Sequence, residues 1–258
     1  EMLIHDYEAY PSANSGGTWM AARPLIAQEL KWAGFDMAGN ANNHSFDYGA
    51  IGVIKTVEHM ESAGIQIAGV GKDLQRASAP VYYDTPKGRI ALISTASTFT
   101  DYGRAGRSRP DIHGRPGLNP LEVNTTTVTT ITQSSADKLR DLVESEGIPG
   151  GGRGRGGRGG GGRGEQTTRI LGQTYRIGDK NETTSVTTIN EDDLERNLNS
   201  IREARRNADI VIVTIHQHGW GGLVEFAHRS IEAGADLFFG HGPHVIRGIE
   251  MYRDKPIF

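Results

Sequence analysis

The chain has 258 residues, of which 36% are hydrophobic and 23% charged, as is usual for a soluble globular protein of one large domain or two small ones. Its net charge of −3 excludes a global basic field of the kind that attracts nucleic acid or an anionic membrane. It contains no cysteine, so a disulfide framework, a cysteine zinc finger and a thiol nucleophile are excluded, and a metal ion would need His, Asp, Glu or Asn ligands.

Neither a run of about 18 apolar residues nor a signal peptide occurs in the chain. The chain begins at Glu1 and ends on the apolar segment 255–258. We therefore expect it to be cut at both ends, with any targeting information outside it.

Helix and strand patterns alternate along the chain. Apolar residues at helical spacing predict helices, and short apolar runs predict buried strands. The predicted helices span 22–33, 49–63, 136–146, 190–207 and 223–233. The predicted strands span 35–38, 65–70, 89–95, 209–215, 236–240 and 245–252. This alternation predicts an α/β fold, a layered sandwich with helices packed on β-sheet.

One segment departs from this pattern. Residues 147–164 contain twelve glycines and four arginines, so they cannot bury enough apolar surface to fold by themselves. We predict a single domain over 1–258, with a flexible insertion at about 145–168 and a Thr-rich connector at 124–135. Arg-Gly repeats are also typical of RNA-binding segments, but four arginines without interleaved aromatic residues favour a plain insertion over a nucleic-acid partner.

Polar side chains follow three of the predicted buried strands, and a further group lies near the start of the chain. The residues in question are Asn40, Asn42, Asn43, His44 and Asp47 after the first strand, His216 and His218 after 209–215, His241 and His244 after 236–240, and His5, Asp6 and Glu8 near the start. In α/β folds ligands bind beyond the carboxyl ends of strands. If the strands are parallel neighbours, we expect the three strand-end groups to open onto one edge of the sheet.

Each group alone has a structural explanation, because a strand-end histidine is often hydrogen-bonded and asparagine is common in turns. Together, imidazoles, an amide oxygen and carboxylates suit Mn, Fe or Zn with open positions for water. Such an ion lowers the pKa of bound water to about 7 and so creates a nucleophile at neutral pH. A further imidazole could protonate a leaving group, and Asp47 could orient the ring of His44.

Four ordered motifs carry a resemblance to a known family. The segments ANNHSFDYG, IHQHGW, GADLFFGHGPHVIRGIE and KPIF resemble the CapA family of poly-γ-glutamate capsule biosynthesis proteins. The resemblance runs from HDYEAYP to KPIF and is densest over 208–258. It implies a metallophosphatase-like, calcineurin-related fold with one or two divalent metal ions. It also implies a membrane-anchored protein whose domain lies outside the cytoplasm, at the bacterial cell envelope.

The resemblance also implies roles for individual residues. Asn43 matches the metal-binding asparagine, and His44 the acid histidine, of the Gly-Asn-His motif of metallophosphoesterases. The residues that match or could supply metal ligands are His216, His241, His244 and Glu8, with Asp6 and His218 as possible additional ligands. Three departures accompany the match: the first Asp-x-His motif is not found, the final motif has one extra residue between its histidines, and the acidic residue after His44 stands at Asp47.

Two functions remain open at this point. The first is a metal-dependent hydrolase that acts on a phosphoester or on a γ-glutamyl or envelope polymer. The second is a non-catalytic component that binds or exports an anionic polymer within a membrane synthase complex. The chain has neither the Gly-x-Ser-x-Gly elbow of serine hydrolases nor the phosphate-binding loop of nucleotide hydrolases.

Overall fold

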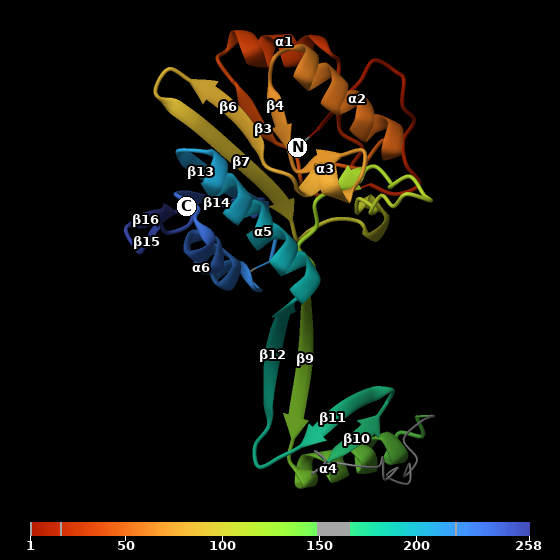
Figure 1. The fold of residues 1–258 in the computed structure, drawn as a ribbon. Helices are drawn as coiled ribbons and strands as arrows, with labels where there is room; N and C mark the ends of the chain where they lie inside the picture. The colour runs from red at the N-terminus through yellow and green to blue at the C-terminus, as the bar shows by residue number, and fades with distance from the viewer. Residues whose placement is uncertain (1, 16, 149–165, 220) are drawn as a thin grey trace. The chain divides into compact units, whose positions relative to one another are not determined.

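The computed structural model describes residues 2–15, 17–148, 166–219 and 221–258 (Figure 1). It divides into two compact units, one of residues 1–123 with 189–258 and the other of residues 124–188. The second unit is longer than the insertion expected at about 145–168, because the Thr-rich segment and the helix before the glycine-rich stretch belong to it. The glycine-rich stretch itself falls mostly within 149–165, outside the described residues.

A six-stranded sheet forms the centre of the first unit, with the strand order β15-β16-β14-β13-β7-β6. Its strands are β6 (Val81–Thr85), β7 (Gly88–Ala96), β13 (Ile210–His216), β14 (Leu237–His241), β15 (Glu250–Tyr252) and β16 (Lys255–Ile257). The four central strands β16, β14, β13 and β7 run parallel, whereas β15 and β6 pair antiparallel at the two edges. Helices α5 (Glu191–Asn207) and α6 (Leu223–Ala233) cover one face (Figure 1).

Alternation along β13 decides which side chains meet the helices. Val211, Val213 and Ile215 are fully buried in the core shared with α5 and α6, where Phe226 and Phe238 pack edge to face. Because side chains alternate between the faces of a strand, the intervening positions 212, 214 and 216 point to the opposite face. The histidine that ends β13 therefore lies on the face away from α5 and α6.

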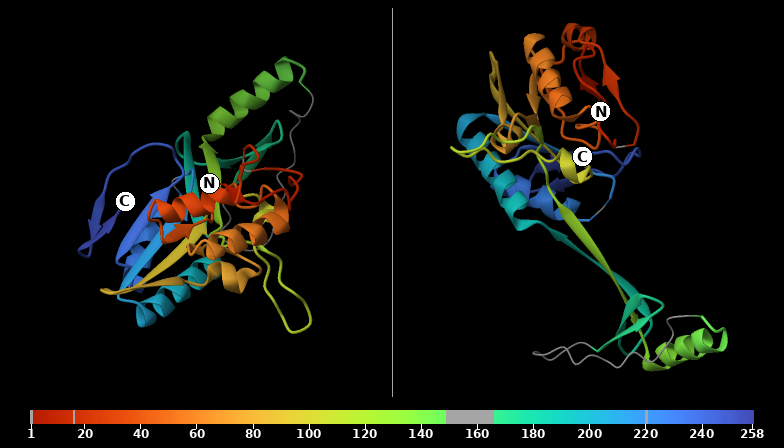
Figure 2. Two further views of the ribbon diagram at one scale, coloured as in Figure 1. Left: turned by 90° about the horizontal axis from the view of Figure 1, so that it is seen from above. Right: turned by 90° about the vertical axis from the view of Figure 1, so that its right-hand side faces the viewer.

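A second, smaller layer packs on that opposite face. It is the parallel pair β3 (Met37–Gly39) and β4 (Gln66–Ala68). Met37 and Ala68 pack against the six-stranded sheet, and Ile67 packs with helices α1 (Leu25–Trp32) and α2 (Gly49–Ser62). Figure 2 shows these two helices outside the β3–β4 pair. The first unit is thus helices, sheet, sheet and helices, which confirms the predicted α/β fold with helices packed on β-sheet.

Short elements link these layers. They are β1 (Leu3–Ile4) paired with β2 (Ala21–Ala22), β5 (Val70–Gly71) paired with β8 (Gly117–Leu118), α3 (Leu74–Ser78) and the 3-10 turn Asp101–Gly103. The strand expected over 65–70 is broken at Gly69, whose φ is +87°. A Cβ at this position would lie 2.8 Å from both Ala41 and Ser94, so the crossing of the two sheets requires glycine.

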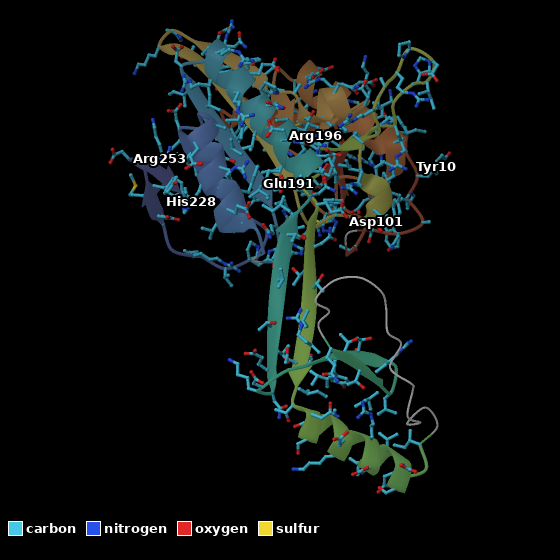
Figure 3. The ribbon with its side chains drawn as sticks, turned by 60° about the horizontal axis from the view of Figure 1, so that its bottom comes forward. Tyr10, Asp101, Glu191, Arg196, His228 and Arg253 are labelled. Carbon is cyan, nitrogen blue, oxygen red and sulfur yellow. The ribbon has the colours of Figure 1, made fainter. Side chains whose placement is uncertain are left out.

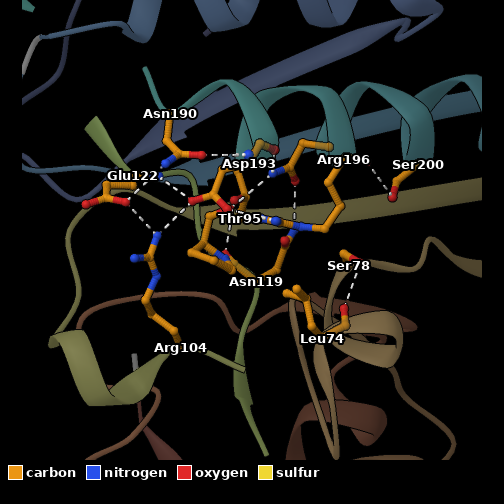
Figure 4. Close-up of polar contacts among 12 residues, drawn as sticks. Leu74, Ser78, Thr95, Arg104, Asn119, Glu122, Asn190, Asp193, Arg196 and Ser200 are labelled. Carbon is orange, nitrogen blue, oxygen red and sulfur yellow. Dashed lines mark hydrogen bonds and ion pairs between the residues drawn. The ribbon is translucent and has the colours of Figure 1, made fainter. Parts of the chain in front are cut away.

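Helix α5 begins where the sequence indicates. The side chain of Asn190 accepts a hydrogen bond from the Asp193 N–H, and arginines lie in the last turn, where the helix dipole favours them. The carboxylate of Asp193 also accepts from Arg104 at 2.9 Å and from the Glu122 N–H at 3.0 Å (Figure 4). This polar network ties the amino end of α5 to the segment 119–122.

The second unit is a four-stranded sheet with one helix. Its elements are β9 (Val123–Ile131), α4 (Gln133–Ser145), β10 (Thr167–Ile170), β11 (Gln173–Ile177) and β12 (Glu182–Ile189), with the strand order β10-β11-β9-β12. Ile131, Ala136, Val143 and Ile170 form its small core. Helix α4 starts three residues earlier than predicted because Thr132 is its N-cap, where its side chain accepts a hydrogen bond from the Ser135 N–H.

Two sequence predictions about local structure were wrong. The segment 124–135 was expected to be a connector, but most of it is strand β9, because β-branched threonine suits extended chain. Its hydroxyls face those of β12 in pairs such as Thr125 with Thr187, at 3.3 Å. The strand expected over 245–252 is limited to β15, because 242–249 form an irregular loop after β14.

Candidate functional site

Two of the predicted histidines meet at the carboxyl ends of neighbouring parallel strands. His216 ends β13 and His241 ends β14, directly opposite each other in the strand register. Their Nδ1 atoms lie 3.3 Å apart, and the Nε2 atom of His241 lies 3.3 Å from the Thr214 hydroxyl. The parallel pairing of the two strands therefore brings the second and third polar groups together at one edge of the sheet.

His218 and His244 extend this pair into a row of four imidazoles. The ring of His218 lies 4.9 Å from that of His216 and 5.6 Å from that of His244, measured between centroids. Gly242 makes the turn possible, because its φ is +113° and a Cβ there would lie 3.1 Å from the His216 ring. We call His216, His218, His241 and His244 the histidine row.

The environment keeps His216 neutral at physiological pH. Burial, followed by the neighbouring rings of His241 and His218, lowers the pKa of His216 to about 3, and His44 contributes in the same direction. A neutral imidazole is the form of histidine that binds a metal ion.

The first polar group reaches the same region from the other sheet. The condition set for one shared sheet edge, that all three strands are parallel neighbours, does not hold for β3, because it pairs only with β4 among the described strands. The end of β3 nevertheless lies over β7 and β13. A Cβ on Gly39 would lie 2.9 Å from the Ser94 hydroxyl and 3.3 Å from the Thr214 hydroxyl. The turn 40–47 thus starts beside the strand that ends in His216.

His44 and Asp47 form a buried pair within this turn. The Nδ1 atom of His44 lies 2.8 Å from Oδ2 of Asp47, whose side chain is 1% exposed. The same Oδ2 accepts a hydrogen bond from the Met20 N–H at 2.9 Å. The backbone N–H of His44 donates to Oδ1 of Asn42 at 2.8 Å. These contacts fix the direction of the His44 ring, and Asn43 beside it is 7% exposed.

The acidic residues near the start of the chain lie in a different setting. Glu8 accepts a hydrogen bond from Nε2 of His59 on α2 at 3.1 Å and another from the backbone N–H of Asp6. The side chain of Glu8 is 32% exposed. Asp6 is exposed. To reach a metal ion at the histidine row, Glu8 would have to exchange its contact with His59 for the ion.

The donor chemistry of the site fits a divalent cation in part. With Zn–N bonds of about 2.0–2.1 Å, two nitrogens on one tetrahedral ion are about 3.3 Å apart, which is the separation of the two Nδ1 atoms of His216 and His241. Within the described parts of the chain, however, no three His, Asp or Glu side chains are arranged to hold one ion. The spacing of the pair is that of two ligands of one ion, and it is equally that of a hydrogen bond between the two rings.

Sequence reasoning missed two residues at this site. Thr214 contacts His241, and Gln217 is 5% exposed behind the histidine row. Thr214 lies two positions before His216 on the same face of β13, so strand alternation was a signal that could have found it. No comparable pattern marks Gln217, because its position depends on the turn after β13.

Comparison with known proteins identifies the family of the chain. The family model of the bacterial capsule synthesis protein PGA_cap matches residues 4–258. The chain belongs to the PGA_cap family. The matched range includes the strand-end turns as well as the six-stranded sheet and the β3–β4 pair of the first unit, since it extends over nearly all of the chain.

Relatives of this PGA_cap chain include proteins from several bacteria. An uncharacterized protein of Sinorhizobium fredii is 35% identical over all of this chain and 56% of its own length. The capsule biosynthesis protein CapA of Bacillus anthracis is 22% identical over all of the chain and 46% of its own length. A probable polyglutamine synthesis accessory protein of Mycobacterium tuberculosis is 29% identical over 84% of the chain and 41% of its own length. The chain thus spans about half the length of these relatives.

The length and apolar character of a helix decide whether it could cross a lipid bilayer. A helix needs about 20 mainly apolar residues to span the hydrocarbon core. Of the helices in the described ranges, none combines that length with sufficient apolar character.

Proposed function

We propose that this PGA_cap chain carries a metal-dependent hydrolytic site that acts on a phosphoester or on a γ-glutamyl bond of an envelope polymer. In this proposal His216 and His241 hold a divalent ion, either Mn, Zn or Fe. His244, Asn43 and Glu8 supply further ligands, with His218 and Asp6 as possible additions. A second ion is compatible with this number of donors.

One observation carries the proposal. His216 and His241 lie at adjacent strand ends with their Nδ1 atoms 3.3 Å apart, and the turn that holds the His44–Asp47 pair starts beside β13. Such strand-end convergence is where α/β proteins bind ligands. Family membership supports a role in capsule synthesis, although a shared fold alone does not assign chemistry.

In this proposal some residues of the chain bind the ion and others transfer a proton. When bound, a divalent ion supplies an acidified water and an electrophilic centre for the substrate oxygen. Asp47 holds the His44 ring by its Nδ1 atom, which leaves Nε2 as the ring atom for a general acid that protonates the leaving group. The buried, neutral ring of His216 binds without first losing a proton.

Metal analysis of the purified intact protein tests this proposal directly. We expect close to one equivalent or more of Mn, Zn or Fe, and a loss of at least about tenfold in affinity for His216→Ala and His241→Ala, because each removes one ligand. Chelation should abolish turnover of phosphoester or γ-glutamyl substrates, and the same metal should restore it.

His228→Ala is the matched control, since this histidine of α6 bonds to Glu250 at 2.8 Å, away from the row. It should bind metal like the wild type. Absence of bound metal from the intact protein, together with no turnover after loading with each of the three metals, would refute the proposal.

A second function is favoured by one relative. The Mycobacterium tuberculosis protein is named a probable polyglutamine synthesis accessory protein. In this alternative the site at the histidine row binds an anionic polymer within a membrane synthase complex at the cell envelope. Recovery of a membrane partner with the intact protein, together with unchanged polymer output by His216→Ala cells, would favour this alternative over hydrolysis.

A further inference from the structure

The outer edge of β12 has no partner strand. β12 is the last strand in the order β10-β11-β9-β12, so only β9 pairs with it among the described residues. Natural sheets protect such edges with short strands, proline, lysine or a bulge, because unpaired backbone N–H and C=O groups recruit another strand. β12 has eight residues, contains neither proline nor lysine, and carries one charged side chain, that of Glu182. Its edge is therefore open to pairing along the strand.

The β9–β12 pair is also uncovered on both faces. Residues 124–127 of β9 and 183–186 of β12 are exposed, and consecutive positions of a strand point to opposite faces. β11 pairs with β9 at Thr130 and Ile131, the last two residues of that strand. Figure 3 shows side chains projecting from the pair, with α4 beside β10 and β11 at one end of it. Two strands alone are marginally stable in water, so further strands at the open edge would stabilise them.

One face of the pair consists of hydroxyl groups in register. Their oxygens lie 3.3, 3.4 and 3.5 Å apart in the pairs Thr125 with Thr187, Thr127 with Ser185, and Thr129 with Thr183. From one pair to the next, the register advances by two residues on each strand, so no bulge interrupts this stretch. We call these six residues the hydroxyl face.

β12 is complementary to itself in antiparallel pairing. If a twofold axis relates two copies at Ser185, that residue lies opposite its own equivalent, and Thr183 lies opposite Thr187 of the second copy. Residues directly opposite each other in an antiparallel pair share a face, so the hydroxyl faces of the two copies join. Contacts between Thr or Ser side chains across strands stabilise a sheet. Glu182 lies opposite Thr188 of the second copy, so no like charges meet.

Other registers match less well. An axis at Val186 keeps the faces together but places Thr183 opposite Ile189 of the second copy. A shift by one residue joins the hydroxyl face of one copy to the other face of its partner, because side chains alternate. The register centred on Ser185 is thus the one that pairs hydroxyl with hydroxyl at positions 183, 185 and 187. A second copy of the chain supplies this pattern by itself.

We propose that two copies of this PGA_cap chain associate through antiparallel pairing of their β12 strands, with Ser185 at the twofold axis. The association joins two β9–β12 pairs into four adjacent strands and gives the open edge of each β12 its hydrogen-bond partners. Interfaces that bury less than about 1,200 Å² in total are weak and transient, and a single pair of strands belongs to this class. We therefore expect a dimer that dissociates on dilution.

Sedimentation velocity of the intact protein tests this inference. In a series from about 1 μM to about 1 mM, the range of weak complexes, we expect a shift from monomer to dimer. Hydrogen exchange of the amides of 183–187 should slow as the concentration rises, because half of them gain partners at the open edge. A protein that stays monomeric over the whole series would overturn the inference.

A charge exchange at the axis locates the contact. Ser185→Glu and Ser185→Lys each place like charges opposite each other in a homodimer, so the dissociation constant should rise about fivefold or more. An equimolar mixture of the two variants brings opposite charges together at the axis and should recover the dimer. A mixture that associates no better than either variant alone would show that Ser185 does not lie on the axis, and the inference would fall.

Thr174→Glu is the matched control. Thr174 is exposed on β11, which lies on the other side of β9 from β12. This variant should dimerise like the parent chain, and circular dichroism checks that all three variants fold. Dimers that persist in both Ser185 variants, or that are lost equally in Thr174→Glu, would contradict pairing through β12. None of these outcomes bears on metal binding by His216 and His241, which is measured separately.

Discussion

Asp47 shows how much one buried carboxylate does in this protein. Its Oδ2 accepts from the Met20 N–H and pairs with Nδ1 of His44, while its backbone carbonyl accepts from the Ser12 N–H at 2.8 Å. It therefore joins the turn 40–47 to the loop that follows β1. At the same time it fixes the ring that we propose as the general acid.

Asp47→Asn is the residue-scale prediction. The amide keeps the size of the side chain and one acceptor oxygen but loses the negative charge, so the hydrogen bonds from His44 and Met20 weaken and we expect a loss of about 1–3 kcal/mol in unfolding free energy. We also expect kcat to fall by about 10–100-fold, because His44 loses its orientation. Denaturation and single-substrate kinetics measure the two effects.

Asp73→Asn is its control, since Asp73 is also a buried carboxylate, and it accepts from the Arg76 N–H and the Ser108 hydroxyl. This variant should lose stability and keep kcat. If both variants lose activity equally, the special role of Asp47 is disproved.

At the scale of helices and strands, Asp236 is a carboxylate that connects several elements. It lies just before β14, and its carboxylate accepts from the Val211 N–H at 2.9 Å, from Arg205 at 2.7 Å and from Lys255 at 2.7 Å. One side chain therefore ties α5, β13 and β16 to the start of β14. Burial alone would raise the pKa of Asp236, but the hydrogen bonds from Lys255 and Val211 lower it below the ordinary 3.8.

Asp236→Asn should therefore lower stability in a pH-dependent way. Because the folded-state pKa is lower than the unfolded one, ionised Asp236 stabilises the fold fully above pH 3.8, and this contribution is lost as the pH falls through the lowered value. We expect a loss of about 1–3 kcal/mol at pH 7 that shrinks towards zero below pH 3.8. Urea denaturation at pH 7, 4.5 and 3 measures it.

Asp84→Asn is the comparison, because Asp84 also pairs with an arginine, Arg89, but is 70% exposed. Exposed pairs of this kind contribute little. A gap between wild type and Asp236→Asn that stays constant from pH 7 to pH 3 would contradict the electrostatic explanation.

At the scale of the whole molecule, the chain forms two compact units, and the second is inserted in the sequence of the first. The chain passes into the second unit after Val123 and back into the first at Ile189, where the Asn190 N–H donates to the Glu122 carbonyl at 2.8 Å. The two points at which the chain crosses between the units are thus adjacent in the first unit. The largest cores of the first unit contain no residue between 124 and 188.

Replacing residues 124–188 by Asn-Gly tests the independence of the first unit. A two-residue Asn-Gly turn suits a tight antiparallel hairpin between Val123 and Ile189. We expect the variant to unfold in one cooperative transition with a Tm within about 5 °C of that of the corresponding transition in the parent chain. Calorimetry measures both. An insoluble product, or a Tm lowered by tens of degrees, would show that the first unit depends on the second.

The sequence by itself determined those helices and strands that depend only on residues a few positions apart. Helix α6 spans Leu223–Ala233 as predicted, and Asn190 caps α5, because apolar spacing and capping residues act within a few positions. The motifs also predicted the family to which the chain belongs. The polar residues at strand ends predicted which side chains form the candidate site. The Thr-rich β9 was missed, since threonine suits both a connector and a strand, and the partner strand β12 decides between them.

Only the tertiary structure decided what depends on distant segments meeting. That β3 belongs to a separate pair over the central sheet, that Nδ1 of His216 and Nδ1 of His241 are 3.3 Å apart, and that Glu8 bonds to His59 are not contained in any local pattern. The same holds for the open edge of β12, which exists because β12 is the last strand of its sheet. The physical reason is that spacing along a chain fixes which face a side chain occupies, whereas packing of the sheets fixes what that face meets.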